Sequence, residues 1–263
     1  MIPSSAPAAH REFVRRAVDV LAADERFVGL AAAGSWAENT MDEFSDLDLV
    51  LAVEPARIDE VMAQRQVIAA SLGDLLVSFT GEHVGEPRLI IGLYDGPLLH
   101  VDLKFVTLDD AGKRVDEPVV IWEREGRLSQ LLGRGKGVFP APDAQWIEDR
   151  FWIWVHAAAS RVARGELFDA IEFLSFLRVN VLGPLSLQKA GRKPMGTRRV
   201  ESALPAFTQE LIGTLSNHDK TSCFAAIVKC AELYRQLRSE NVTRHTKAEQ
   251  AAMAYLAAVT AAS

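Results

Sequence analysis

The spacing of apolar residues changes near residue 140, and this change limits the fold more than any other feature of the sequence. Before it, short apolar runs alternate with turn residues, a pattern typical of strands joined by tight connections. After it, apolar residues recur at the spacing of amphipathic helices. Long amphipathic segments joined by short loops indicate a helical bundle. The sequence therefore predicts a domain of strands and helices over residues 1–138 and an all-α domain over residues 139–263.

Individual elements follow from the same patterns. We expect strands at 27–33, 47–53, 75–79, 89–94, 98–106 and 119–122, and helices at about 10–24 and 57–72. A Gly/Pro-rich segment at 133–142 should link the two domains. Beyond it we expect helices at about 143–164, 166–190, 206–215, 219–239 and 246–262. Asp143 and Asp219 are suited to open two of these helices, and Gly165 to end one.

Charge and composition narrow the function. The net charge is −6, with residues 1–118 net negative and residues 119–263 net positive. An acidic chain lacks the basic surface by which proteins bind duplex nucleic acid, so a nucleic-acid partner is disfavoured. The acidic part favours metal cations and a cationic acceptor, and the basic part favours phosphates.

The location of the protein is predicted from what the sequence lacks. No stretch approaches the roughly 20 uncharged apolar residues of a membrane helix, and the N-terminus has no apolar signal core. Cys223 and Cys230 lie two turns apart on one expected helix, roughly 10 Å along its axis, which is too far for a disulfide. We therefore expect a cytoplasmic protein without a membrane partner.

The first candidate site motif is a Gly-Ser pair after a strand of small residues. Gly34 allows the backbone to approach a ligand closely. Ser35 and the amide groups of a following short helix would hold a phosphate, because unpaired N–H groups converge there. A Gly-Ser turn is also a common helix N-cap, so the motif alone does not define a site.

Two carboxylates open the second motif, which is an apolar strand. Asp46 and Asp48 are two residues apart, so a strand projects both from the same face. Such a pair repels itself unless a cation lies between, and carboxylate oxygens suit Mg²⁺.

The third motif places His100, Asp102 and Lys104 on one face of another strand. If this strand is a neighbour of the second motif, Asp102 completes a cluster of three carboxylates. Alternating polar residues are also what the solvent-facing side of an antiparallel strand shows, and Lys104 is then an ion-pair partner for Asp102. The three motifs taken together, in this order, favour a site.

These motifs resemble the nucleotidyltransferase superfamily that includes DNA polymerase beta. Gly34-Ser35, the pair Asp46 and Asp48 eleven residues later, and Asp102 on a later strand look most like the aminoglycoside and lincosamide nucleotidyltransferases of antibiotic resistance. The segment 120–128 is similar to a strand, turn and helix of this family, with Glu125 where an aspartate is usual. The helical half is more loosely similar to streptomycin-type 6-adenylyltransferases.

The resemblance implies an α+β fold, with a mixed β-sheet and flanking helices before the helical, substrate-binding bundle. It implies that Asp46, Asp48 and Asp102 are catalytic and bind two Mg²⁺ ions. ATP or another NTP would be the co-substrate, held by Gly34 and Ser35. We add Ser45 and Lys104, which adjoin these carboxylates in sequence, as candidate nucleotide ligands.

The acceptor side is less defined by sequence. Candidate general bases in the helical half are Glu166, Glu172 and His156, of which Glu172 stands out because apolar residues flank it. A basic segment and the tryptophans are further candidates for nucleotide contacts: Lys189, Arg192, Lys193, Arg198 and Arg199; Trp36, Trp122, Trp146, Trp152 and Trp154. Solvated charges and core packing are the ordinary roles of such residues.

The sequence thus predicts Mg²⁺-dependent transfer of a nucleoside monophosphate, AMP from ATP in the first instance, to a hydroxyl of a small acceptor such as an aminoglycoside. One alternative is a nucleotide-binding protein without catalysis, although all three carboxylates are present. Another is transfer to a protein or to RNA, and the acidic charge disfavours RNA. The oligomeric state is left open.

Overall fold

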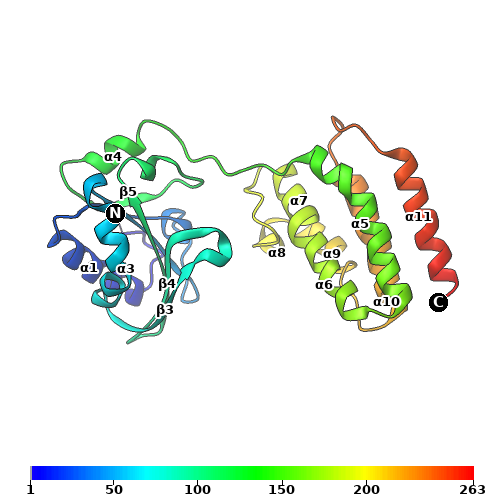
Figure 1. The fold of residues 1–263 in the computed structure, drawn as a ribbon, viewed down its shortest axis with the longest axis horizontal. Coiled ribbons are helices and arrows are strands. Elements are labelled where there is room, and N and C mark those ends of the chain that lie inside the picture. Colours follow the sequence, from blue (N-terminus) through cyan, green and yellow to red (C-terminus); the bar gives the residue numbers. More distant parts are fainter. Residues whose placement is uncertain (1) are drawn as a thin grey trace. The chain divides into compact units, whose positions relative to one another are not determined.

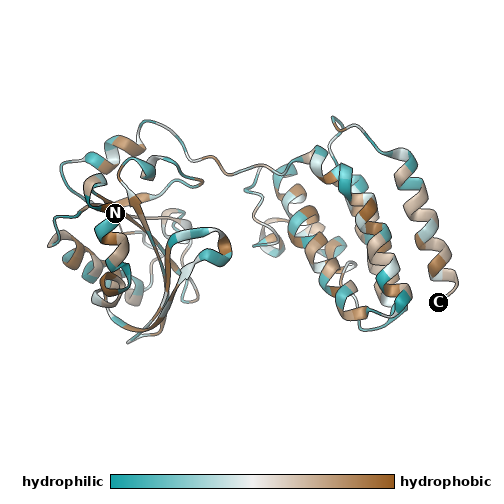
Figure 2. Ribbon diagram, viewed as in Figure 1, coloured by the Kyte–Doolittle hydropathy of each residue, from teal (hydrophilic) through white to brown (hydrophobic). Residues whose placement is uncertain are grey.

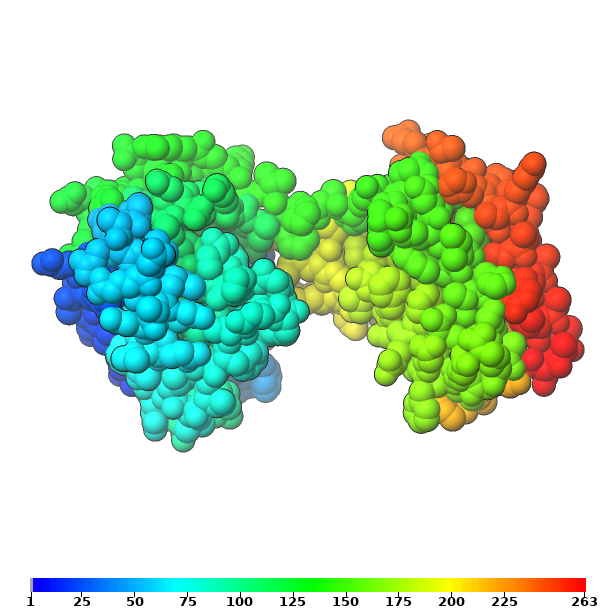
Figure 3. Space-filling model, viewed as in Figure 1, coloured from blue at the N-terminus to red at the C-terminus, as the bar shows by residue number. Residues whose placement is uncertain are grey.

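A computed structural model describes residues 2–263 of the chain. The chain divides into two compact units, one ending at Phe139 and the other running from Pro140 to Ser263. Each unit has its own hydrophobic core. Figures 1 and 3 show the two units, with colours that follow the sequence. The segment between them, from Gly135 to Asp143, contains neither helix nor strand.

The first unit is built on one six-stranded sheet. Its strands are β1 (Phe27–Ala32), β2 (Leu47–Val53), β3 (Asp74–Gly81), β4 (Glu86–Asp95), β5 (Leu99–Thr107) and β6 (Val119–Glu123). Their order across the sheet is β3-β4-β5-β2-β1-β6. Only β2 and β5 are parallel, and the other neighbours are antiparallel. All six expected strands and the mixed sheet are therefore confirmed.

One face of the sheet is closed by two helices, α1 (Ala8–Ala22) and α3 (Ile58–Ser71). Alternate residues of β2 and β5 point into this layer and are almost completely buried, among them Leu47, Leu49 and Val101. Removing such side chains from water contributes roughly 1.5–3 kcal/mol each. The burial of these residues fixes the orientation of both strands, because a slip of one residue would turn them to the other face.

The opposite face is closed only in part. The short helix α4 (Arg127–Leu132) follows β6 and packs its Leu128 against Ala31, Ala52 and Val106. The turn before it has positive φ at both Glu125 and Gly126. The strand, turn and helix expected for this segment are thus present.

The second unit is a helical bundle. Its helices are α5 (Ala144–Arg164), α6 (Leu167–Leu177), α7 (Gly183–Lys189), α8 (Val200–Ala203), α9 (Pro205–Ile212), α10 (Lys220–Leu237) and α11 (Thr246–Ala261). Asp143 accepts a hydrogen bond from the Trp146 amide and caps α5, and Asp219 caps α10 in the same way. Gly165 ends α5 in the left-handed conformation. Apolar segments of α5, α6 and α10 supply its core (Figure 2).

The helix expected over 166–190 is present as a continuous helical segment, but its α-helical regularity is interrupted. A π-helical turn, Arg178–Leu182, separates α6 from α7. Pro184 explains the interruption, because proline has no N–H and its ring collides with the carbonyl four residues earlier in a regular helix. A side chain at Gly183 would also lie 2.2 Å from the carbonyl oxygen of Gly196, so the backbone passes very close there.

The same segment bears on the expected absence of a membrane helix. Leu167–Lys189 is long and apolar enough to cross a membrane by length and composition, with a mean hydropathy of 1.3 over its most apolar window. Of that window, 56% is buried within the structure. The core helix of a globular protein passes the same test, so this is weak evidence.

The cysteines behave as the helical spacing predicts. Cys223 and Cys230 both lie in α10, are buried and form no disulfide. Burial raises the pKa of the Cys230 thiol to about 12. A cytoplasmic location stays a prediction.

Candidate active site

Asp48 and Asp102 are brought together by the pairing of β2 with β5. The two strands are parallel neighbours, and Asp48 lies directly opposite Asp102 in their register. Residues paired in this way project to the same face of a sheet, on strands roughly 4.8 Å apart. Two carboxylates that are 54 residues apart in sequence thus lie side by side.

Asp46 precedes β2 by one residue and is partly exposed. Burial raises the pKa of Asp102, and the negative charge of Asp46 raises it further, whereas His100 acts in the opposite direction. Asp46 therefore acts electrostatically on Asp102, as a member of the same acidic cluster would.

His100 occupies the space beside Asp102. Its Nε2 lies 3.0 Å from Oδ1 of Asp102, and its side chain is half exposed. The contact is close but misaligned, because this buried oxygen accepts no hydrogen bond of normal geometry from the residues that the structure describes. The Asp102 carboxylate is thus only partly compensated.

Gly34 reaches Asp48 from the other side. It begins the short helix α2 (Gly34–Ala37) with φ of +56°, and the amide of Ala33 donates a 2.9 Å hydrogen bond to the Asp48 carbonyl. A Cβ at residue 34 would lie 2.2 Å from Oδ2 of Asp48. Glycine is therefore required here both by conformation and by the closeness of the carboxylate. Ser35, the next residue, is buried.

Ser45 holds the loop that leads into Asp46. Its hydroxyl donates to Oδ1 of Asp42 at 2.9 Å and accepts from the Asp42 amide at 3.0 Å. Its carbonyl oxygen lies 2.7 Å from Nε2 of the buried His10. In this structure the hydroxyl of Ser45 is engaged within the loop.

Lys104 lies two residues beyond Asp102 and pairs with a different acid. Its Nζ is 2.9 Å from Oε2 of Glu86, and Arg88 also binds that carboxylate. The hydrogen bond from Arg88, with the contribution of Lys104, lowers the pKa of Glu86 to about 2. A role for Lys104 in nucleotide binding stays a prediction, and it would require the ammonium to be shared with Glu86.

The cluster fits magnesium by the chemistry of its donors. Mg²⁺ prefers oxygen ligands and is commonly held by one or two carboxylates together with substrate phosphates. Within residues 2–263, however, no three His, Cys, Asp or Glu side chains are arranged as a ready metal site. The backbone therefore places Asp48 and Asp102 together, while their side chains would have to turn to share an ion.

The candidate general bases of the helical unit are all on its surface. Glu172 is exposed on α6, so its apolar sequence neighbours do not bury it. Glu166 is exposed and forms an ion pair with Arg164. His156 is exposed on α5, where its ring packs at 4.3 Å on that of Tyr255.

The basic segment and the tryptophans have mixed environments. Lys189 donates a 3.0 Å hydrogen bond to the carbonyl of Gln236, and Arg199 has a positive φ of 59°. Trp36 and Trp152 are buried, whereas Trp146 is 45% exposed. These two buried rings belong to the core, which is the ordinary role of such tryptophans.

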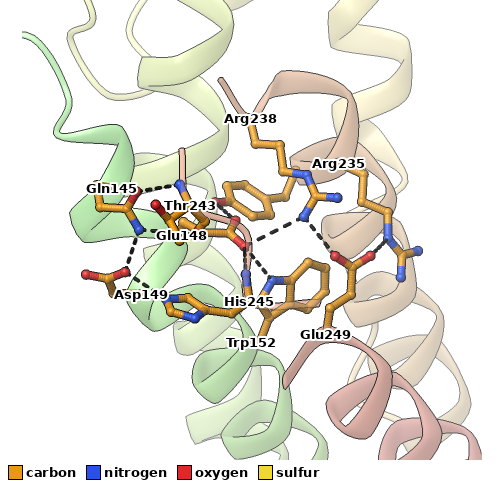
Figure 4. A network of polar contacts seen from close by, with 10 residues as sticks. Gln145, Glu148, Asp149, Trp152, Arg235, Arg238, Thr243, His245 and Glu249 are labelled. Carbon is orange, nitrogen blue, oxygen red and sulfur yellow. Dashed lines mark hydrogen bonds and ion pairs between the residues drawn. The ribbon is translucent and has the colours of Figure 1, made fainter. Parts of the chain in front are cut away.

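A buried carboxylate that the sequence interpretation missed lies in the helical unit (Figure 4). Glu148 on α5 is fully buried and accepts hydrogen bonds from the Tyr234 hydroxyl at 2.6 Å, the His245 amide at 3.1 Å and Trp152 Nε1 at 3.3 Å. Arg238 lies 3.8 Å away. The signal was available, because Glu148 lies one turn before Trp152 on the apolar stripe of the helix.

This network connects three parts of the helical unit. Glu148 joins α5, α10 and the segment before α11, and Glu249 continues it through Arg235 and Arg238 (Figure 4). Three hydrogen bonds satisfy the buried carboxylate, as a stable buried charge requires. We assign this network to stability.

No protein-family model matches the chain, and no curated protein matches it. The chain is similar to an aminoglycoside 6-adenyltransferase from Bacillus subtilis, with 18% identity over 95% of each chain and a TM-score of 0.36. It is similar to a nucleotidyltransferase-like protein from Exiguobacterium sibiricum, with 14% identity, 92% and 77% of the two chains covered and a TM-score of 0.39. A spectinomycin adenyltransferase from Enterococcus faecialis, solved with ATP and spectinomycin, has 11% identity, coverage of 95% and 99%, and a TM-score of 0.29.

These proteins are of the class that the sequence motifs resemble. One fold can host different activities. The activity of this chain is therefore inferred from the residues of its own site.

Proposed function

We propose that this protein transfers a nucleoside monophosphate, AMP from ATP in the first instance, to a hydroxyl of a small acceptor. The observation that supports it most is the side-by-side placement of Asp48 and Asp102, with Gly34 against the Asp48 carboxylate. In this proposal the unit up to residue 138 is catalytic, and residues 139–263 form a helical unit that takes part in binding the acceptor.

The residues of the site have distinct roles in this proposal. Asp46, Asp48 and Asp102 would hold magnesium with the triphosphate. When bound, magnesium polarises the α-phosphate and stabilises the leaving pyrophosphate. Gly34 and Ser35 would receive the terminal phosphates, since Gly34 begins α2 and the first amide groups of a helix have no partner within it. By holding magnesium, the aspartates would also position the triphosphate, and such positioning supplies much of the rate in phosphoryl transfer.

Pyrophosphate release tests this function directly. The assay would supply each of the four NTPs with Mg²⁺, together with aminoglycosides and lincosamides as acceptors. Asp48→Asn and Asp102→Asn are expected to lose acceptor-dependent release, because each removes an anionic ligand without removing packed volume. Asp19→Asn is a matched control, since Asp19 is exposed on α1, which covers the other face of the sheet.

The outcomes separate the alternatives. Full activity of Asp48→Asn contradicts the assignment. Nucleotide binding that depends on Asp48, without release for any acceptor including protein, indicates the alternative of binding without catalysis. Release with an aminoglycoside or lincosamide identifies a resistance activity.

A further inference from the structure

An exposed apolar strip lies on the sheet near the proposed site. We define the apolar strip as Val77, Phe79, Ile91 and Leu93, on β3 and β4. The side chains of Val77 and Phe79 are 58% and 51% exposed. Their strand, β3, lies at the edge of the sheet, with one side unpaired. Natural proteins usually protect edge strands with charge or a bulge that turns them away. The pairing register of β3 shifts at Leu75/Val77 and at Thr80/Gly81, so its edge is irregular, whereas apolar side chains on its face are exposed.

The strip shares its face with the carboxylates. Phe79 pairs with Ile91, which pairs with Asp102, which pairs with Asp48. Side chains of residues paired in this way stand on the same face of the sheet. The apolar strip therefore continues across the sheet from the two aspartates, on the part of this face that α4 does not close.

His83 lies beside the aromatic end of the apolar strip. Its ring centroid is 5.5 Å from that of Phe79, and the two ring planes are inclined at 51°.

The geometry of nucleotidyl transfer indicates on which side of Asp48 and Asp102 the acceptor lies. In an in-line displacement, the attacking oxygen and the leaving pyrophosphate lie on opposite sides of the α-phosphorus. Gly34 and Ser35 adjoin Asp48 on the β1 side, where the terminal phosphates are proposed to lie. The acceptor must then approach from the side of Asp102 and β4, where the apolar strip begins.

We infer that the acceptor of this enzyme is an amphipathic hydroxyl compound whose apolar face rests on Val77, Phe79, Ile91 and Leu93. This inference rests on the proposed nucleotidyl transfer. The acceptor hydroxyl oxygen forms a bond to the α-phosphorus, the bond to the pyrophosphate oxygen breaks, and the hydroxyl proton leaves to solvent. A sugar with an alkyl or aromatic substituent fits this surface, whereas a polycation that is polar on every side leaves the strip uncovered.

The Kd values of alkyl glucosides of increasing chain length test this inference. Methyl, butyl and hexyl β-glucoside would be titrated by calorimetry into the full chain with Mg²⁺ and a non-hydrolysable ATP analogue. Each methylene group that is fully buried lowers Kd about fourfold. We expect the hexyl compound to bind at least about tenfold more tightly than the methyl compound, since the strip is open on one side.

Two substitutions locate the effect. Phe79→Ser and Val77→Thr should each reduce the dependence of Kd on chain length, with the ATP analogue bound as in the wild type. Val67→Ser is the matched control, since Val67 is 72% exposed on α3, which lies on the other face. Thermal unfolding shows whether the variants fold, and Val77→Thr preserves a β-branched residue suited to a strand.

Several results would overturn the inference. For the wild type, such a result is a Kd that does not fall with chain length, or no binding of any glucoside. For Phe79→Ser, it is an unchanged dependence of Kd on chain length, or weaker binding of the ATP analogue. A wild-type dimer that Phe79→Ser converts to a monomer would show that a second copy covers the strip. Failure of the transfer proposal itself is seen separately, as nucleotide binding that does not depend on Asp48.

Discussion

Replacing Gly34 by alanine tests the contact between the turn after β1 and the Asp48 carboxylate. The added Cβ would lie 2.2 Å from Oδ2, whereas carbon and oxygen atoms that are not bonded normally stay more than about 3 Å apart. The carboxylate must therefore move by about 1 Å. Asp48 is short and its oxygen is a side-chain terminus, so it can turn away without unfolding the sheet.

This substitution affects the stability of the protein and the rate of transfer by two different causes. A residue other than glycine at φ of +56° is destabilised by roughly 1–2 kcal/mol. In a unit of this size that lowers the Tm by about 2–4 °C for each kcal/mol. A displacement of about 1 Å in a catalytic group can lower the rate by about 100-fold. We therefore expect a small loss of stability and a loss of transfer of about 100-fold.

Gly126→Ala supplies the matched control. Gly126 has a similar φ of +69°, but a Cβ there would meet no atom within 4 Å. The control should show the same loss of Tm with transfer nearly unchanged. Thermal unfolding and pyrophosphate release with ATP, Mg²⁺ and an active acceptor measure both properties. Transfer by Gly34→Ala within tenfold of the wild type, or an equal loss in Gly126→Ala, would refute the reasoning.

Three further predictions concern stability and the metal. Glu86→Gln should lower the free energy of unfolding by about 1–2 kcal/mol at neutral pH, a figure reduced for solvent screening. The pKa of Glu86 is depressed to about 2, so this contribution to stability is present above the unfolded pKa of about 4.5 and disappears as pH falls towards 2. Urea unfolding that shows the same stability difference between variant and wild type at pH 7 and pH 2.5 would contradict this prediction. Glu148→Gln should cost about 2 kcal/mol because the hydrogen bonds to Tyr234 and its neighbours lose an ionised acceptor, and a Tm equal to that of the wild type would exclude this role. Removal of divalent metal with EDTA should abolish nucleotide binding in calorimetry and added Mg²⁺ should restore it, whereas unchanged binding in EDTA would argue against a metal-dependent site.

The sequence predicted much of the local structure because local patterns carry it. Alternation of apolar and polar residues indicated all six strands, and it placed Asp46 and Asp48 on one strand face and His100 and Asp102 on another. Capping residues such as Asp143 marked where helices begin. Apolar periodicity over 166–190 indicates one helix, and Pro184 accounts for the π-helical turn within it.

Burial was the least predictable property of the site candidates. Glu172 lies between two apolar residues in sequence but is exposed, whereas Glu148, which has an aspartate on one side, is buried. The orientation of a helix around its own axis decides both cases, and packing against other helices sets that orientation. Lys104 similarly pairs with Glu86, an acid on a different strand, and not with the nearby Asp102.

By itself the sequence determined the strands, the helices and the face on which each carboxylate stands, since these depend on neighbours a few residues away. Only the tertiary structure decided that β2 and β5 are parallel neighbours in the register that sets Asp48 opposite Asp102. It also decided that β3 and β4 extend this face with apolar residues, of which those on β3 are exposed. The physical reason is that strand pairing joins segments far apart in the chain, and the choice among registers depends on the burial of the whole sheet.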